Sequence, residues 1–155
     1  WVQTHVYQDV SEPLKQLKSA NYQVVAADTA GQSVDYREVD FTRPTALLLG
    51  AEKYGISDGA SAFIDTRITV PMLGMVESFN VSVACAIILA EARRQREDAG
   101  FYQQRRLDDD RYRQLLFEWS QPLLARYCQK HQLKYPALDN QGDIIDRDWR
   151  ADHQL

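Results

Sequence analysis

The hydrophobic positions in the N-terminal half of the chain form three short runs with little alternation, at residues 22–27, 45–49 and 68–70. Segments with helical character precede the first run and separate the second from the third, at residues 11–21 and 58–64. Short apolar runs that do not alternate are typical of strands covered on both faces, and helices connect strands that run parallel. The pattern therefore predicts an α/β fold built on a parallel sheet.

The longest predicted helix spans residues 80–99 and changes character half-way along. Residues 81–90 are almost all small or apolar, which predicts that this half is buried all round. The following residues are polar and are expected to reach solvent before Gly100 ends the helix. In the helix at 11–21, Ser11 is a candidate N-cap, with Pro13 in the first turn.

The C-terminal third predicts two amphipathic helices, at residues 108–119 and 121–131, followed by a tail. From Lys134 onward the sequence is rich in Asp and contains the run Asn-Gln-Gly, which predicts a loop-like and partly mobile segment. The chain is thus expected to divide into an α/β domain over residues 1–100 and a helical extension with its tail over residues 101–155.

Composition narrows the class of protein only modestly. A chain of 155 residues, 45% of them hydrophobic, can bury one ordinary core with an appendage. A net charge of −4 gives no electrostatic argument for a nucleic-acid partner, so any basic patch must be local. Two cysteines, Cys85 and Cys128, suggest reduced thiols rather than a disulfide framework, and no signal peptide is visible. We expect a cytoplasmic protein. The three histidines lack metal-ligand spacing, so no metal is expected.

Two loops that follow predicted strands carry the candidate chemistry, because open parallel sheets bind ligands at the carboxyl ends of their strands. In the first loop, Gly50 and Gly55 permit sharp turns around Glu52. The alternative is a surface glutamate on a tight turn. In the second loop, residues 70–84 place Ser78 and Asn80 before the apolar helix. Either residue could instead serve only as a helix cap.

The two loops in this order resemble a known family. LLLGAEKYGIS at 47–57 and VPMLGMVESFNVSVACAIILAEARRQR at 70–96 look like the second and third motifs of the SPOUT class of RNA methyltransferases. The segments at 35–44, 99–102 and 115–118 also fit. Within the class, the chain is most similar to the tRNA guanosine-18 ribose 2'-O-methyltransferase (TrmH-like) subgroup. The resemblance implies a parallel-sheet α/β trefoil knot that binds S-adenosylmethionine, with tRNA as the substrate.

The resemblance also implies roles for individual residues. The expected cofactor-binding positions are Ala27, Gly50, Val70, Met72, Leu73, Gly74 and Phe79. Ala27 stands where the family often has a hydroxylated residue and Phe79 where it often has Leu. Glu52, Ser78 and Asn80 match polar active-site positions, which are expected to orient the ribose or phosphate and a catalytic arginine.

The family's first motif, which carries that arginine, would lie before Trp1. We therefore expect an active enzyme as the full-length protein and an inactive 155-residue fragment that lacks the first strands. The alternative is a non-catalytic RNA-binding or dimerisation module with a vestigial pocket.

Two partner predictions complete this set. Family members build their site across a two-fold interface, so we expect a homodimer that uses the helix at 80–99. An RNA-facing role is expected for an arginine cluster beyond the buried half of that helix. Its members are Arg93, Arg94, Arg96, Arg105 and Arg106. The alternative is a solvated group of cations that complements the helix dipole.

Overall fold

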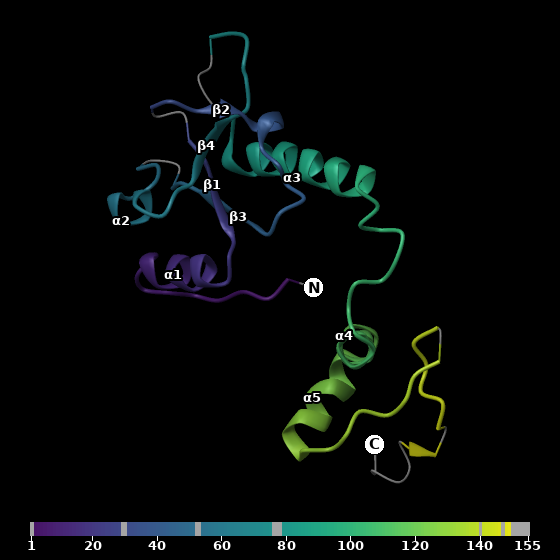
Figure 1. The fold of residues 1–155 in the computed structure, drawn as a ribbon. Coiled ribbons are helices and arrows are strands. Elements are labelled where there is room, and N and C mark those ends of the chain that lie inside the picture. The colour runs from purple at the N-terminus through teal and green to yellow at the C-terminus, as the bar shows by residue number, and fades with distance from the viewer. Residues whose placement is uncertain are drawn as a thin grey trace. The chain divides into compact units, whose positions relative to one another are not determined.

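The structure is a computed structural model that describes residues 2–28, 31–51, 54–75, 79–139, 141–146 and 148–149. Contacts divide the chain into two compact units, one made of residues 4–104 and the other of residues 105–155 with 1–3. Each unit is described by itself (Figure 1). Within the described residues, no helix is both long and apolar enough to cross a membrane.

The first unit contains a four-stranded sheet in the order β2-β4-β1-β3, and all three strand pairs are parallel. Its strands are β1 (Gln23–Ala27), β2 (Val34–Asp35), β3 (Thr45–Leu49) and β4 (Thr66–Thr69). The predicted parallel α/β fold is confirmed. The prediction missed β2, which has only two residues, and it started β4 too late because Thr66 and Arg67 are polar.

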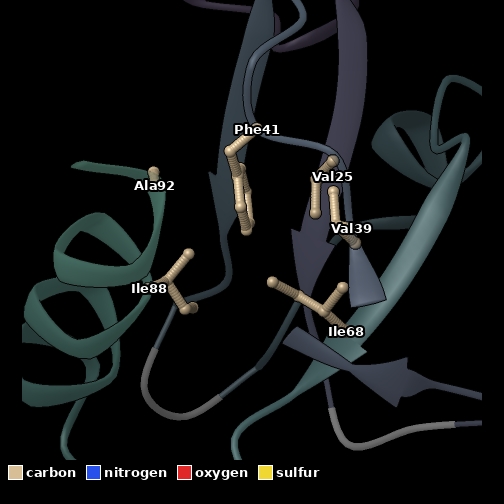
Figure 2. Packing of buried hydrophobic residues seen from close by; sticks show 6 residues of the cluster. All are labelled: Val25, Val39, Phe41, Ile68, Ile88 and Ala92. Carbon is tan, nitrogen blue, oxygen red and sulfur yellow. The ribbon is translucent and has the colours of Figure 1, made fainter. Parts of the chain in front are cut away.

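Helices cover both faces of this sheet (Figure 1). On one face, Ile88 and Ala92 of α3 (Val81–Asp98) pack with Val25, Ile68 and Phe41 (Figure 2). On the other, Leu14 of α1 (Ser11–Ser19) and Ala60 of α2 (Asp58–Ser61) pack on Val24. Because successive side chains of a strand point to opposite faces, the neighbours Val24 and Val25 are both fully buried.

Burial along α3 differs from the prediction. Only Ile88 and Ala92 of this helix are buried, so the expectation that residues 81–90 are buried all round is wrong. Val81, Val83 and Leu89 expose 37%, 45% and 54% of their surface. The physical reason is that a sheet covers a single stripe of a helix, and the described residues of this unit leave the other apolar side chains of α3 exposed.

The helix starts were predicted unequally well. Asn80 is the N-cap of α3, and its side chain accepts a hydrogen bond from the Ser82 backbone N–H at 2.9 Å. The prediction for α1 is wrong, because Ser11 lies inside the helix and Val10 holds the cap position. Asp9 takes the capping role, since its Oδ1 accepts from the Ser11 N–H at 2.9 Å.

The polar half of α3 holds the segment that follows the short 3-10 helix η1 (Tyr36–Glu38). The Gln95 side chain donates to the Val39 carbonyl at 3.0 Å and accepts from the Phe41 N–H at 2.8 Å. Arg96 Nε donates to the Phe41 carbonyl at 2.9 Å. Side chains of α3 therefore satisfy backbone groups that no strand partner reaches.

The second unit pairs α4 (Asp109–Ser120) with α5 (Pro122–His131). Phe117, Ala125 and Cys128 form its core together with Trp149 of the tail. The tail is largely irregular, as predicted, but it packs on the helices through Tyr135 and other apolar side chains. The Phe117 and Tyr135 rings stack with their centres 4.5 Å apart. The tail is therefore part of this unit's core, which the prediction of a partly mobile segment did not anticipate.

Candidate functional site

A cavity of about 420 Å³ lies at the carboxyl ends of β1, β3 and β4, beside the first turn of α3. The described residues that line it are Ala27, Asp28, Leu49, Gly50, Ala51, Gly55, Ile68, Thr69, Val70, Phe79, Asn80, Val81 and Ala84. Small and apolar side chains dominate, with a few polar groups among them. That composition is typical of a site for a small molecule, and the volume falls in the range of such pockets.

The loop after β3 forms one wall of the cavity and is closed by its own backbone. Ala51 and Gly55 exchange two hydrogen bonds, at 2.9 and 2.8 Å. Gly55 has a φ of +63°, and a Cβ on Gly50 would lie 2.6 Å from the Gly55 carbonyl carbon. Both glycines are therefore required by the turn itself. Glu52, the predicted active-site carboxylate of this loop, lies outside the described residues.

The structure brings four of the seven predicted cofactor-binding positions together in the cavity wall, namely Ala27, Gly50, Val70 and Phe79. Met72, Leu73 and Gly74 are not among the residues that line it. The Leu73 side chain is fully exposed. The assignment of these seven residues to cofactor binding stays a prediction.

Of the three predicted catalytic residues, Asn80 is the one that the structure describes. Its position is compatible with both predicted roles, active-site residue and helix cap. It lines the cavity, and its side-chain oxygen caps α3. The amide nitrogen of the same side chain can donate hydrogen bonds that the cap does not use. Ser78 lies outside the described residues.

The sequence prediction missed the one charged side chain among the described lining residues, Asp28. This carboxylate forms an ion pair with Arg67 of β4. Arg67 also donates to the Ser61 hydroxyl of α2 at 3.3 Å. The signal was present, because Asp28 is the first polar residue after the apolar run 22–27.

The arginines predicted to face RNA have protein partners in the structure. Arg94 forms ion pairs with Glu91 and Asp98, both at 2.7 Å, and Arg96 is bonded to the Phe41 carbonyl. The hydrogen bond from Arg94, helped by one from Gln95, lowers the pKa of Glu91 to about 2. Arg93 lies 3.8 Å from Glu97.

Arg105 and Arg106 belong to the second unit. Arg105 pairs with Asp109 and lies over the Tyr112 ring at 4.2 Å, and Arg106 also has an interaction partner. None of these contacts tests an RNA-facing role for the five arginines, which stays a prediction.

A parallel α/β sheet with a small-molecule cavity at its strand ends defines a broad class of ligand-binding and transferase domains. Within the described part of the chain, no group of three or more His, Cys, Asp or Glu residues is placed to hold a metal ion. Similarity to known proteins narrows this class to one family.

Family models match almost the whole chain. Residues 1–90 match the SpoU rRNA Methylase family, and residues 94–147 match the C-terminal domain described as SpoU, rRNA methylase, C-terminal. The chain is 43% identical over 157 aligned residues to the tRNA (guanosine(18)-2'-O)-methyltransferase of Escherichia coli K12, covering 99% of this chain and 69% of that protein. The chain therefore belongs to the SpoU methylase family and is a TrmH-like SPOUT methyltransferase.

Solved structures agree with this assignment. The A. aeolicus TrmH/SpoU tRNA modifying enzyme matches with a TM-score of 0.66 and 36% identity, over 83% of this chain and 61% of that one. AviRb from Streptomyces viridochromogenes, in complex with AdoMet, matches with a TM-score of 0.53 and 32% identity, over 58% and 37%. The chain thus spans 69% of the length of the E. coli relative, 61% of the A. aeolicus enzyme and 37% of AviRb.

Proposed function

We propose that the protein is an S-adenosylmethionine-dependent RNA ribose 2'-O-methyltransferase that acts on guanosine 18 of tRNA in the cytoplasm. The observation that carries the proposal is the cavity at the strand ends, which is lined by the glycine loop and by the start of α3. It is supported by the 43% identity to a relative named for this reaction. A structural relative that has AdoMet bound shares the fold.

The residues present fit the cofactor. An adenosine group needs apolar walls, which Leu49, Val70 and Phe79 supply. When bound, S-adenosylmethionine supplies an electrophilic methyl group on a sulfonium. Gly50 and Gly55 bring backbone polar groups to the cavity wall with no side chain in between. The trefoil knot implied by the resemblance is proposed together with this pocket.

The protein's own task is to place a ribose hydroxyl in line with the methyl group, because such a hydroxyl is a poor nucleophile near neutral pH. We assign this positioning to Asn80, whose side chain is fixed by its cap bond at the cavity edge. Glu52 and Ser78 are proposed to assist it by orienting the ribose or phosphate and a catalytic arginine.

The protein is further proposed to act as a homodimer through α3. Three large apolar side chains of this helix stay more than a third exposed, although its sequence is that of a buried helix. An isologous contact with a second copy would bury them. Arg93, Arg94 and Arg105 are proposed to contact tRNA by exchanging their acidic partners for phosphates. Arg96 and Arg106 are proposed to contact tRNA as well.

The test is mass spectrometry of tRNA nucleosides after incubation of the protein with unmodified tRNA and S-adenosylmethionine. The expected product is 2'-O-methylguanosine, and it should be absent when tRNA with adenosine at position 18 is used. The alternative, a non-catalytic module, predicts tRNA binding with no methylated nucleoside. If full-length protein, including any sequence before Trp1, gives no methylated nucleoside, the enzymatic proposal is overturned.

A further inference from the structure

Asp28 stands apart from the other described residues that line the cavity because it alone is charged. Its side chain is only 16% exposed, and its partner Arg67 is only 27% exposed. A carboxylate is costly to remove from water, so its retention among mainly small and apolar lining residues calls for a function or a structural reason. The ion pair with Arg67 compensates for the charge but does not account for its place in the wall.

The carboxylate is held at two points by β4. The Asp28 backbone N–H donates to the Ile68 carbonyl at 3.1 Å, which extends the pairing of β1 with β4 by one residue. The side chain is held by Arg67, the residue before Ile68. A group fixed through both its backbone and its side chain is preorganised, and it loses little conformational freedom when it binds a ligand.

Arg67 is itself fixed. Ile68 packs in the core on the α3 side, so Arg67 points to the other face of the sheet. There it donates to the Ser61 hydroxyl of α2. The two carboxylate oxygens together offer about four acceptor positions, so Asp28 can bond to Arg67 and to a further protein group and still accept a hydrogen bond from a ligand.

We propose that Asp28 is a cofactor-binding residue that accepts a hydrogen bond from the bound cofactor, and that Arg67 positions it. The inference rests on the proposed function and adds to it a contact that the family resemblance did not supply. The donor chemistry is a polar N–H or O–H group. In S-adenosylmethionine, either the ribose hydroxyls or the α-ammonium group can provide it.

The main test is calorimetric titration of the protein with S-adenosylmethionine and with S-adenosylhomocysteine. Asp28→Asn keeps the size of the side chain but replaces one acceptor with a donor and removes the charge. A hydrogen bond to a charged group is worth enough that both Kd values should rise about tenfold or more. Asp65→Asn is the matched control, because Asp65 also pairs with a cation, Lys18, but does not line the cavity. It should leave both Kd values unchanged.

A third ligand separates the two donors. Methylthioadenosine keeps the ribose but lacks the α-ammonium group. If Asp28→Asn weakens all three ligands equally, the contact is to the ribose. If it spares methylthioadenosine, the contact is to the ammonium group. Both outcomes support the proposal.

The double variant Asp28→Asn/Arg67→Gln controls for an arginine left without its partner. If it regains wild-type affinity, the loss in the single variant came from the stranded guanidinium, and the proposal is overturned. Unchanged Kd values in Asp28→Asn overturn it as well. Absence of cofactor binding by the unaltered protein is a different result, because it overturns the proposed function and this inference together.

Discussion

At the scale of single residues, Gly50 is the glycine at which the surrounding backbone leaves least room for a side chain. A Cβ there would meet the Gly55 backbone at 2.6 Å, and backbone atoms cannot rotate away as a side chain can. Gly50→Ala should therefore open the loop and abolish cofactor binding, while the sheet stays folded. Calorimetry and thermal unfolding measure the two effects.

Gly59→Ala is the matched control for this prediction. Gly59 lies in α2, and a Cβ added there has no atom within 4 Å. Alanine stabilises a helix relative to glycine by about 0.5–1 kcal/mol, so this variant should bind cofactor normally and unfold at a slightly higher temperature. Wild-type affinity in Gly50→Ala would show that the loop does not shape the binding site.

Asn80 allows its two roles to be separated by one substitution. Aspartate keeps the oxygen that accepts from Ser82 and is at least as good a cap, but it loses the amide donors. Asn80→Asp should therefore keep the unfolding temperature and lower kcat at least about tenfold. Asn80→Ala should lower both, the stability by about 1 kcal/mol. If Asn80→Asp retains full activity, Asn80 is only a cap.

The sequence predicted Gly50 and Asn80, whose roles depend on the neighbouring backbone. It did not predict Asp28, whose role depends on a residue far away in the sequence. Gly50 and Asn80 stand next to the turn or helix that explains them, so local pattern identified both. Asp28 is explained by Arg67, which is 39 residues away and reaches it only because β1 and β4 are neighbours. Strand order cannot be deduced from the hydrophobic pattern.

At the scale of elements, the Glu91 carboxylate accepts hydrogen bonds from two other side chains of the polar half of α3. Hydrogen bonds from Arg94 and Gln95 lower its pKa from the ordinary 4.5 to about 2 in the folded state. A depressed pKa means that the stabilisation is fully present above about pH 4.5 and is lost as the pH falls toward 2. Glu91→Gln should therefore flatten the decline of the unfolding free energy across this window.

Urea unfolding at several pH values between 5 and 2.5 measures this slope. Glu97→Gln is the control, since it removes one carboxylate from the same helix, where the nearest arginine nitrogen is 3.8 Å away. That variant should keep the slope of the unaltered protein, because a loose exposed pair contributes little. An unchanged slope in Glu91→Gln would contradict the prediction.

Helices and strands were predicted correctly where the residues of a hydrophobic run are also the residues that the fold covers. The strand predicted at 45–49 matches β3, and the helix predicted at 121–131 begins one residue before α5. The prediction that α3 is buried on all sides failed. An apolar sequence indicates that a helix has to be covered, but it does not show whether the same chain or another chain covers it. Similarly, Tyr135 and Trp149 of the tail were not recognised as core, since each packs on helices that precede it in the chain.

At the scale of the whole molecule, the exposed apolar side chains of α3 are the feature that the described residues leave unexplained. Surfaces of this kind mark interaction sites in proteins. Leu89 exposes 54% of its surface, although its neighbours on the same helix, Ile88 and Ala92, are packed in the core. If a second copy covers this face by two-fold symmetry, each substitution on it acts twice in the interface.

Leu89→Glu should therefore convert the proposed dimer to a monomer, because it places two like charges in a desolvated contact. The measurement is sedimentation velocity over a range of protein concentrations. Leu123→Glu is the matched control, since Leu123 is 77% exposed but lies in α5 of the other unit. The control should sediment as the unaltered protein does.

Because Leu89 is solvent-exposed in the single chain, the Leu89→Glu variant should keep the circular dichroism spectrum of the unaltered protein. This measurement separates dissociation of the dimer from unfolding. A monomeric unaltered protein would overturn the proposed dimer. A Leu89→Glu dimer of unchanged stability would place the dimer interface elsewhere on the protein.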